Sequence, residues 1–404
     1  MRWLRLVAPL AMLAVVLAVV VAPRAGPVAG DSQAQASDSA KLASSVRLTN
    51  AQRARDAFAA MRLSFSSGPE SMRENYPSSE TYSSLWPYSQ ALIAANQMLA
   101  IDPTGANLAV SLRTGLASYW DERSSPPGYA ASPVPPVGDG ERRYFDDNDW
   151  TGLALVQLYR QTGDPTALAQ AEQVLRFVIS GWDGDPTHGR PGGVWWSQQM
   201  PNLRFAHRNT VSTAAGAELA LRLYDATGRS NAEYLDWGRR MYEWVQGNLL
   251  LEDGEYGDHV DMVGNVDGGV LTYNQGIMIG SAVMLYQFTG ESSYLATARS
   301  VANATLAKYR PLNFSDQPIY NAIFFRNVLL LQNVSPDPSY LEAMATYADS
   351  IWNNNRDSDT GLFRFSYRQY PRSLPETRRL NDQAGMVQIF AALAMDAADY
   401  QSLV

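Results

Sequence analysis

The chain has 404 residues, of which 46% are hydrophobic and 18% are charged, and it contains no cysteine. This apolar fraction is typical of a globular protein and excludes a disordered, collagen-like or low-complexity chain. The lack of cysteine excludes a disulfide scaffold, a thiolate metal site and a cysteine nucleophile. The formal net charge of −8 predicts an acidic surface, so we expect no nucleic-acid partner.

The N-terminus carries the pattern of a sorting signal. Arg2 and Arg5 precede an uncharged apolar run from Leu6 to Ala22, and small residues follow, including an A-x-A motif at Ala34–Ala36. Such a pattern is typical of a secretory signal peptide. We expect residues 1–36 to be a cleaved signal peptide, or alternatively a retained N-terminal anchor, leading into a short flexible linker. Either way, the prediction is a secreted or extracytoplasmic protein whose body makes no membrane contact.

Three segments repeat one pattern, in which an apolar helix is followed by Thr-Gly, a short polar turn and a second helix. The Thr-Gly pairs begin at Thr162, Thr227 and Thr289, which gives spacings of 65 and 62 residues. Glycine directly after a helix accepts the left-handed conformation that ends it. A weaker copy lies at residues 331–341, and another surrounds Asp102-Pro-Thr-Gly105.

The helices after these turns are amphipathic. Apolar residues recur at helical spacing at Tyr234, Trp237, Met241, Trp244 and Val245, and again at Tyr340, Met344, Tyr347 and Ile351. A period near 60 residues with two helices per unit predicts a helical toroid or solenoid, here of about six pairs counting a C-terminal helix from Ala384 to Ala398. Because no polar capping repeat is evident, we predict a closed (α/α)6 barrel, all-α, formed by residues 47–400 as a single domain.

The segments between the helices are rich in aromatic residues, glycine, amides and acids. They include Tyr144–Trp150, Gly192–Trp196, Asp253–His259, Thr272–Gly276, Tyr320-Asn321 and Asn381–Gln383. Aromatic rings stack on the C–H faces of sugars, while amides and carboxylates pair with sugar hydroxyls. These loops therefore indicate a glycan-binding cleft at one end of the barrel. The alternative for any single tryptophan, such as Trp195 or Trp196, is a place in the core.

The adjacent acids Asp146 and Asp147 suggest a catalytic pair. Neighbouring like charges raise one pKa, so one carboxyl stays ionised and one protonated, which is the division that glycoside hydrolysis requires. The alternative is that the acids precede a helix running from about Trp150 to Tyr159, with Asp149 as its cap. On the dipeptide alone, the second interpretation is favoured.

Other kinds of site have little support in the sequence. The three histidines, His188, His207 and His259, show no zinc-binding spacing. Loop acids such as Asp183 and Asp258 fit no calcium-loop pattern and are better explained as solvated turn residues. No phosphate loop, nucleophile elbow or dinucleotide motif is present, so we expect neither a metal nor a cofactor.

The motif Tyr144-Phe-Asp-Asp-Asn-Asp-Trp150 resembles glycoside hydrolase family 76, the endo-α-1,6-mannanases. The resemblance continues, in family order, through Gly192-Gly-Val-Trp-Trp196, Thr272-Tyr-Asn-Gln-Gly276 with Ile-Met-Ile-Gly280, and Asn381-Asp-Gln-Ala-Gly385. It covers roughly residues 50–400. An ordered series of separated motifs is far more specific than any one of them, so the resemblance favours catalysis by the aspartate pair.

The family resemblance implies an (α/α)6 fold and roles for individual residues. Asp146 looks like the nucleophile and Asp147 like the general acid/base. The sugar-contacting positions it suggests are Trp150, Trp195, Trp196, Asn209, Tyr273, Asn274, Gln275 and Asp382. After Asn209 the chain departs from the family pattern, since Thr210-Val-Ser-Thr-Ala214 stands where an Asn-Gly-Pro-Ala-like stretch is expected.

The resulting hypothesis is a secreted, monomeric, retaining hydrolase that cleaves α-1,6-mannosidic bonds inside mannan, with α-1,6-linked mannan or mannooligosaccharide as its partner. Three alternatives remain open. One is a hydrolase or lyase of another polysaccharide on the same fold, although the acidic chain and the aspartate pair argue against a lyase. The others are a cell-wall transglycosylase, which would use the same two carboxylates, and a non-catalytic glycan-binding protein.

Overall fold

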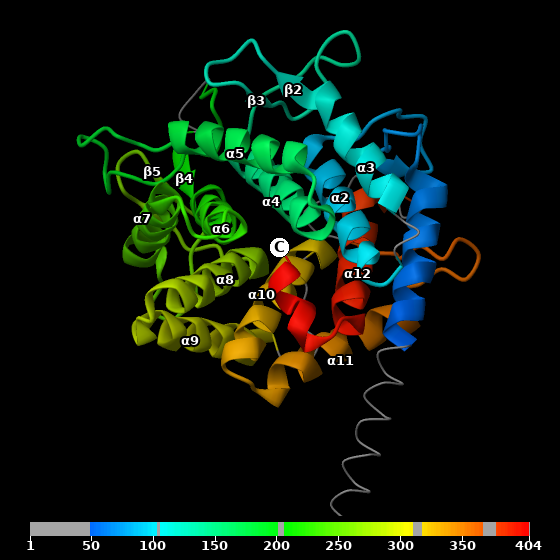
Figure 1. Cartoon of the computed structure of the whole chain (residues 1–404). Coiled ribbons are helices and arrows are strands. Elements are labelled where there is room, and N and C mark those ends of the chain that lie inside the picture. The colour runs from blue at the N-terminus through cyan, green and yellow to red at the C-terminus, as the bar shows by residue number, and fades with distance from the viewer. Residues whose placement is uncertain (1–48, 103–105, 201–205, 310–316, 367–376, 404) are drawn as a thin grey trace, which may run out of the picture. The chain divides into compact units, whose positions relative to one another are not determined.

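The computed structural model describes residues 49–102, 106–200, 206–309, 317–366 and 377–403, all within one compact unit, Val46–Val404. Inner and outer helices alternate along the chain. The inner helices are α2 (Leu85–Leu99), α4 (Phe145–Thr162), α6 (Thr210–Ala226), α8 (Thr272–Thr289), α10 (Pro318–Val334) and α12 (Leu380–Ala394). Each packs against the next, and α12 packs back against α2, so the inner helices close into a ring (Figure 1).

The outer helices cover this ring. They are a helix over residues 49–65, α3 (Ala106–Gly115), α5 (Pro165–Ser180), α7 (Ala232–Leu249), α9 (Ser292–Tyr309) and α11 (Pro338–Asn354). Inner helices are enclosed all round, as in α8, which is buried continuously from Thr272 to Leu285. Outer helices bury one stripe, which for α11 includes Tyr340, Met344 and Tyr347. The predicted (α/α)6 barrel is thereby confirmed.

The predicted helix ends are also observed. Gly163 and Gly290 follow α4 and α8 with φ of 74° and 76°, and their N–H groups donate to Tyr159 and Tyr286. These are the left-handed caps expected from the Thr-Gly repeats. The predicted turn at residues 103–105 and the N-terminal residues 1–48, with the expected signal sequence, lie outside the described residues. Among those described, no helix combines the length and apolarity needed to cross a bilayer.

Two glycines of the sequence motifs allow inner helices to approach closely. A Cβ on Gly276 of α8 would lie 2.6 Å from Phe324 Cα of α10. A Cβ on Gly385 of α12 would lie 2.6 Å from the backbone nitrogen of Ile319, also in α10. Both contacts are with backbone, which cannot rotate aside as a side chain can. The motif glycines therefore set the spacing of the ring around α10.

The inner helices all begin at the same end of the ring. Phe145 N–H donates to Trp196 O and Thr210 N–H to Asp258 O, while Thr272 Oγ1 contacts Asn321 Oδ1 at 2.9 Å. Across the remaining gap, Leu380 N–H donates to Glu74 O. These contacts hold the starts of α4, α6, α8, α10 and α12 against one another or against the loops at this end, so their positive dipole ends lie on the same side of the ring.

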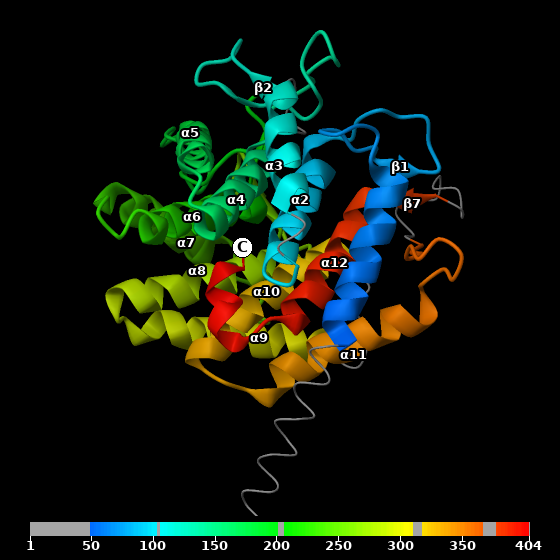
Figure 2. The same cartoon turned by 45° about the vertical axis from the view of Figure 1, so that its right-hand side comes forward.

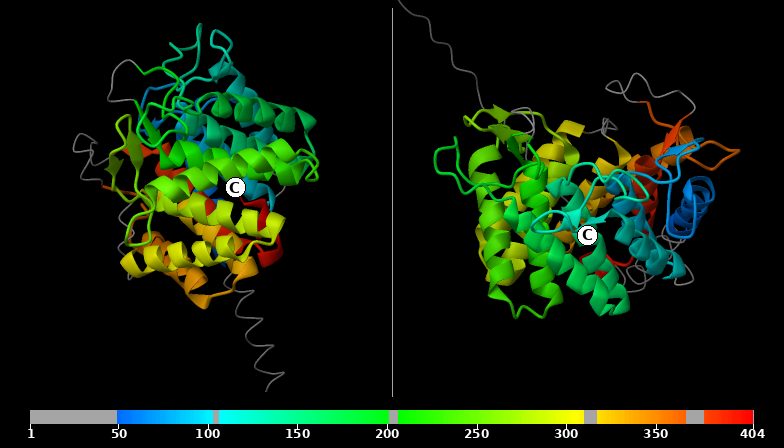
Figure 3. Two further views of the ribbon diagram at one scale, coloured as in Figure 1. Left: turned by 90° about the vertical axis from the view of Figure 1, so that its left-hand side faces the viewer. Right: turned by 90° about the horizontal axis from the view of Figure 1, so that it is seen from above.

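Short strands add to this end of the ring. They are β1 (Asn75–Tyr76), β2 (Trp120–Asp121), β3 (Gly128–Tyr129), β4 (His207–Asn209), β5 (His259–Asp261), β6 (Val266–Asp267) and β7 (Arg378–Arg379). Antiparallel pairs form between β1 and β7, β2 and β3, β4 and β5, and β5 and β6. Figure 2 shows β1 beside β7 although about 300 residues separate them, and Figure 3 shows the green strands beyond one end of the helices.

The C-terminal segment closes the opposite end of the ring. The 3-10 helix η4 (Ala397–Ser402) replaces the last turn of the helix that was predicted to continue to Ala398, since α12 ends at Ala394. Arg160 of α4 and Arg222 of α6 both donate to Gln401 O, at 3.2 and 2.9 Å. The chain thus ends at the centre of the ring (Figure 1), and only the strand-bearing end remains for a cleft.

Candidate active site

The aspartate pair lies in the first turn of an inner helix. Helix α4 begins at Phe145, whose N–H donates to Trp196 O, so Asp146 and Asp147 are inside the helix rather than before it. The expected start near Trp150, with Asp149 as the cap, is wrong. The bridge between Tyr144 and Ser197 fixes the earlier start, and no local sequence signal reveals that contact. Asp149 is instead fully buried, one turn further along.

The environment of Asp146 favours a carboxylate that ionises near neutral pH. Burial raises its pKa to about 7, and the negative charge of Asp258 adds to the rise. Opposing this, Trp196 Nε1–H donates to Asp146 Oδ2 at 3.3 Å, and backbone N–H groups of the helix start also stabilise the anion. Asp146 is therefore the member of the pair whose ionised form is directly stabilised.

Asp147 is held as a neutral acid. Burial raises its pKa well above the usual value, and the charges of Asp146 and Glu74 raise it further. Glu74 is fixed in place because its Oε2 accepts from both Ser84 N–H, at 2.9 Å, and Ser84 Oγ, at 2.6 Å. The two acids therefore differ: Asp146 accepts a hydrogen bond that stabilises its ionised form, whereas Asp147 keeps its proton.

A stack of aromatic rings forms the wall beside Asp146. The rings of Trp196 and His207 lie 5.3 Å apart and nearly parallel, and His259 follows at 4.3 Å from His207. Asp258 accepts at 2.8 Å from His259 Nδ1, which raises the pKa of that histidine. The rings offer a flat apolar face on which a sugar ring can stack. Their N–H groups and the carboxylates at their edges can form hydrogen bonds with sugar hydroxyls.

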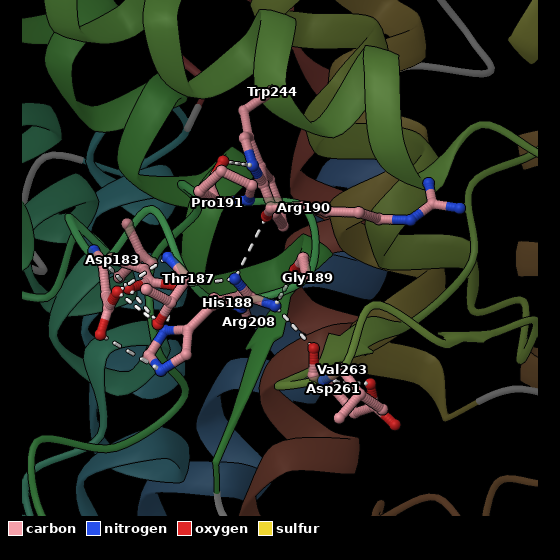
Figure 4. A network of polar contacts seen from close by, with 12 residues as sticks. Asp183, Thr187, His188, Gly189, Arg190, Pro191, Arg208, Trp244, Asp261 and Val263 are labelled. Atoms are coloured by element: carbon pink, nitrogen blue, oxygen red, sulfur yellow. Dashed lines mark hydrogen bonds and ion pairs between the residues drawn. The ribbon is translucent and has the colours of Figure 1, made fainter.

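A buried arginine next to His207 in the chain holds several loops together (Figure 4). Arg208, in β4, lies between Asp183 on one side and the backbone of Asp261 on the other, with contacts of 2.6 Å to each. Asp183 also contacts His188 Nδ1 at 3.0 Å, and Trp195 covers the guanidinium at 5.1 Å. Asp183 is therefore a buried structural partner, which corrects the expectation of a solvated turn acid.

Three of the motif amides tether loops to the inner ring. Asn148, Gln275 and Gln383 each occupy the fourth position of an inner helix. Each exchanges two hydrogen bonds with the backbone N–H and C=O of one loop residue 19 or 20 positions earlier. Those loop residues are Tyr129, Tyr256 and Phe363. The repeated amide therefore fixes the segments that lie beside the starts of these inner helices.

The suggested sugar-contacting residues fall into separate groups. Trp195 and Trp196 are half-buried and line the wall already described. Tyr273 and Asp382, at 9% and 3% exposure, lie in the first turns of α8 and α12. Asn209, at 5%, precedes α6 and contacts His207 Nδ1 at 2.8 Å. These residues surround the same end of the ring as the aspartate pair.

Three of the suggested residues are fully or almost fully buried. Gln275 is fully buried, and its amide accepts from Tyr256 N–H and donates to the carbonyls of Tyr256 and Leu271. It therefore tethers a loop rather than facing a sugar. Trp150 is 1% exposed, beneath Trp86 at 5.4 Å and beside the guanidinium of Arg326 at 5.6 Å. Asn274 is also fully buried, and its amide has no hydrogen-bond partner in the described part of the chain.

Sequence reasoning missed several residues of the site. Glu74 and Ser84 come from the segment before α2, which matches none of the motifs. His207 was considered only as a metal ligand, and His259 was otherwise included only as the end of a predicted cleft loop, whereas all three histidines of the chain cluster around Trp195 and Trp196. No histidine is adjacent to a tryptophan in the sequence, so no local signal marks either this cluster or Glu74. Within the described residues, no group of three His, Asp or Glu side chains could hold a metal ion.

Comparisons with known proteins agree with this architecture. The chain is 23% identical to a family 76 mannosidase of Bacteroides thetaiotaomicron, with a TM-score of 0.74 over 86% of this chain and 98% of that one. A second structure is an inactive α-1,6-mannanase variant of Salegentibacter sp. HEL1_6, with two adjacent aspartates changed to asparagine, in complex with α-1,6-mannotriose. It is 20% identical, with a TM-score of 0.69, over 85% of this chain and 99% of that one. Both likenesses establish the fold.

Among curated proteins, the chain is 30% identical over 199 residues to the mannan endo-1,6-alpha-mannosidase DCW1 of Saccharomyces cerevisiae. The match covers 46% of this chain and 42% of that protein, so the chain spans less than half the length of this relative. The sequence profile of glycosyl hydrolase family 76 matches residues 135–402, about two thirds of the chain, including both aspartates and every later motif. The chain therefore belongs to glycosyl hydrolase family 76.

Proposed function

We propose that the protein is a retaining glycoside hydrolase that cleaves α-1,6-mannosidic bonds within mannan backbones. The observation that carries this proposal is the difference between the two aspartates. Asp146 accepts a hydrogen bond from Trp196, and the negative charge of Glu74 raises the pKa of Asp147. Membership of the family and the mannan-directed names of its relatives support the choice of sugar.

In the first step, the ionised Asp146 attacks the anomeric carbon on the face opposite the leaving oxygen. Asp147 gives its proton to that oxygen, so the glycosidic bond breaks as the bond to Asp146 forms. The Trp196 N–H keeps Asp146 in its ionised form before attack. Retaining enzymes place the two carboxyl groups about 5–5.5 Å apart, a separation within reach of neighbouring residues.

In the second step, Asp147 has lost its proton and acts as a base. It takes a proton from water while that water attacks the anomeric carbon, which releases Asp146 and restores the α-configuration. The charge of Glu74 helps here as well, because it favours recapture of a proton by Asp147. Neither step needs a cofactor.

Recognition of the polymer falls to the wall of Trp196, His207 and His259, on which sugar rings can stack. An extracytoplasmic location, suggested by the N-terminal sequence, would bring the enzyme to mannan, the polymer that its relatives are named to act on.

The test is incubation of the purified chain with unbranched α-1,6-mannan, with products identified by mass and by anomeric proton NMR. We expect short oligosaccharides that are initially α-configured, and none from Asp146→Asn or Asp147→Asn. Asp149→Asn is the matched control on the same helix. Intact mannan with the unmodified chain would exclude the proposed activity, and initial β-products would exclude the retaining mechanism.

The roles within the pair can be separated with azide and an activated aryl mannoside. Azide replacing the nucleophile in Asp146→Ala attacks from the opposite face and gives a β-mannosyl azide. Azide replacing the activated water in Asp147→Ala attacks the intermediate and gives an α-mannosyl azide. The reverse assignment of products would exchange the two roles.

A further inference from the structure

A second feature of the strand-bearing end is a pocket lined by Glu74, the residue whose charge acts on Asp147. It has a volume of about 580 Å³, which lies within the range of about 300–1,000 Å³ for small-molecule sites. Its lining includes Glu74, Glu80, Thr81, Tyr82, Ser132 and Glu141. None of the suggested sugar-contacting residues belongs to it.

The pocket adjoins the acid rather than the nucleophile of the pair. Glu74 lines it and is close enough to Asp147 for its charge to act on that carboxyl. Ser84, another lining residue, directly precedes α2 and holds Glu74 through two hydrogen bonds. Helix α2 packs against α4, which carries Asp147. Ser132, which also lines the pocket, follows Ala131, whose carbonyl accepts from Leu85 N–H, and Tyr129 close by is bonded to Asn148, the residue after Asp147. The pocket therefore lies on the side of Asp147, whereas the aromatic wall contacts Asp146.

The acid of a glycosidase donates its proton to the oxygen of the departing sugar, so that sugar must lie on the side of the acid. We propose that this pocket holds the leaving-group sugar, and afterwards the acceptor, and that it selects neutral, hydroxyl-rich units over anionic ones. The proposal rests on the glycosidase function proposed above and extends it to the specificity of the same site.

The chemistry of the lining supports this selection. Carboxylates and hydroxyls accept and donate hydrogen bonds to sugar hydroxyls. Three acids, Glu74, Glu80 and Glu141, face the pocket, and its described lining includes no basic side chain, so a phosphate or carboxylate on the sugar would be repelled. Tyr82 is the one aromatic residue among the described lining.

The pocket also comes from a different part of the chain than the catalytic pair. Most of its lining precedes residue 135, where the match to the family begins, whereas both aspartates lie inside it. The bond-breaking machinery is thus shared with the family, while the leaving-group side is built from residues outside the matched region.

The experiment compares two substrates that differ in the leaving group. In α-1,6-mannotetraose the leaving group is a sugar, whereas in α-mannobiosyl fluoride it is a fluoride ion that needs no pocket. The variant is Thr81→Trp, an exposed rim residue whose replacement fills the pocket. The control is Thr166→Trp, an exposed threonine at the start of the outer helix α5.

For Thr81→Trp we expect kcat/KM on the tetraose to fall by about tenfold or more, with turnover of the fluoride nearly unchanged. Transfer of the mannobiosyl group to added mannose should be lost in parallel, because the acceptor uses the same pocket. Equal loss on both substrates, or no loss on either, would overturn the pocket assignment alone. Failure of the unmodified chain on both substrates would overturn the proposed function together with it.

A second arm tests the acidic lining with mannose and mannose 6-phosphate as competing acceptors. We expect the unmodified chain to transfer predominantly to mannose, and the double variant Glu80→Gln, Glu141→Gln to lose much of this preference. Equal transfer to both acceptors by the unmodified chain would overturn the selection against anions.

Discussion

The hydrogen bond from Trp196 to Asp146 is the contact whose removal tests the mechanism most directly. In Trp196→Phe the ring remains available to stack on His207, but the Nε1–H that meets Asp146 Oδ2 at 3.3 Å is lost. Because this donor stabilises the ionised carboxylate, its loss raises the pKa of Asp146 above the present value of about 7.

The magnitude follows from the strength of such a contact. A hydrogen bond to a charged group contributes about 1.5–3 kcal/mol, and the 3.3 Å length places this one at the lower end. At about 1.4 kcal/mol per pKa unit, the acidic limb of the pH profile should move up by about one unit. At pH values below the pKa of Asp146, its ionised fraction falls about tenfold for each pH unit. At a given acidic pH, kcat/KM of Trp196→Phe should therefore be about tenfold lower than that of the unmodified chain, with little difference on the plateau.

The assay is kcat/KM on α-1,6-mannotetraose across pH, which reports the macroscopic values of the coupled pair. The matched control is Trp195→Phe, since that ring contacts His188 and Arg208 instead of the aspartate pair. A uniform fall in rate at all pH values, with the acidic limb unmoved, would refute the role assigned to the Trp196 donor.

Three further predictions concern other parts of the structure. Glu74→Gln keeps an acceptor for Ser84 but removes the charge that raises the pKa of Asp147, so the alkaline limb of kcat/KM should move to lower pH. An unmoved limb would contradict this coupling. Burial raises the pKa of Asp149 well above its usual value, so the folded protein keeps a proton that the unfolded chain releases above pH of about 4, and stability falls as pH rises. Asp149→Asn should therefore gain melting temperature relative to the unmodified chain between about pH 4 and pH 8, whereas a constant difference would show that the ionisation is not the cause. Gly276→Ala forces α8 away from α10 and should lower the free energy of unfolding by about 1–3 kcal/mol in urea titrations. Gly247→Ala, at an exposed and open position in α7, is the control and should not lower it, and equal effects of the two changes would argue against close approach.

Much of the architecture was predictable because its causes are local. Helical periodicity and a glycine after each Leu-Tyr segment determine where helices form and end, as at Gly163 and Gly290. The repetition of this unit then leaves few ways to bury every apolar face, and a closed ring is one of them. Asp146 and Asp147 became catalytic candidates in another way, because the dipeptide alone favoured a helix start and only the ordered series of separated motifs pointed to catalysis.

The division of work among the polar motif residues could not be predicted in the same way. Gln275 and Asn274 are neighbours in the sequence, yet only the fold shows that the first tethers Tyr256 while the second remains without a hydrogen-bond partner among the described residues. Trp150 belongs to the motif of the aspartate pair but lies beneath Trp86. A motif records which residues occur together, whereas the direction of each side chain depends on its position around the helix and on the neighbouring helices.

The sequence by itself therefore determined the helical repeat and the barrel, because these depend on residues close together in the chain, and its ordered motifs pointed to the acidic pair as the candidate catalytic residues. Only the tertiary structure decided how the two acids differ. Trp196 comes from the loop after α5 and Glu74 from the segment before α2, and the closed ring brings them to opposite members of the pair. The electrostatic difference between Asp146 and Asp147 arises from contacts across 50 and 73 positions of the chain, which no local pattern encodes.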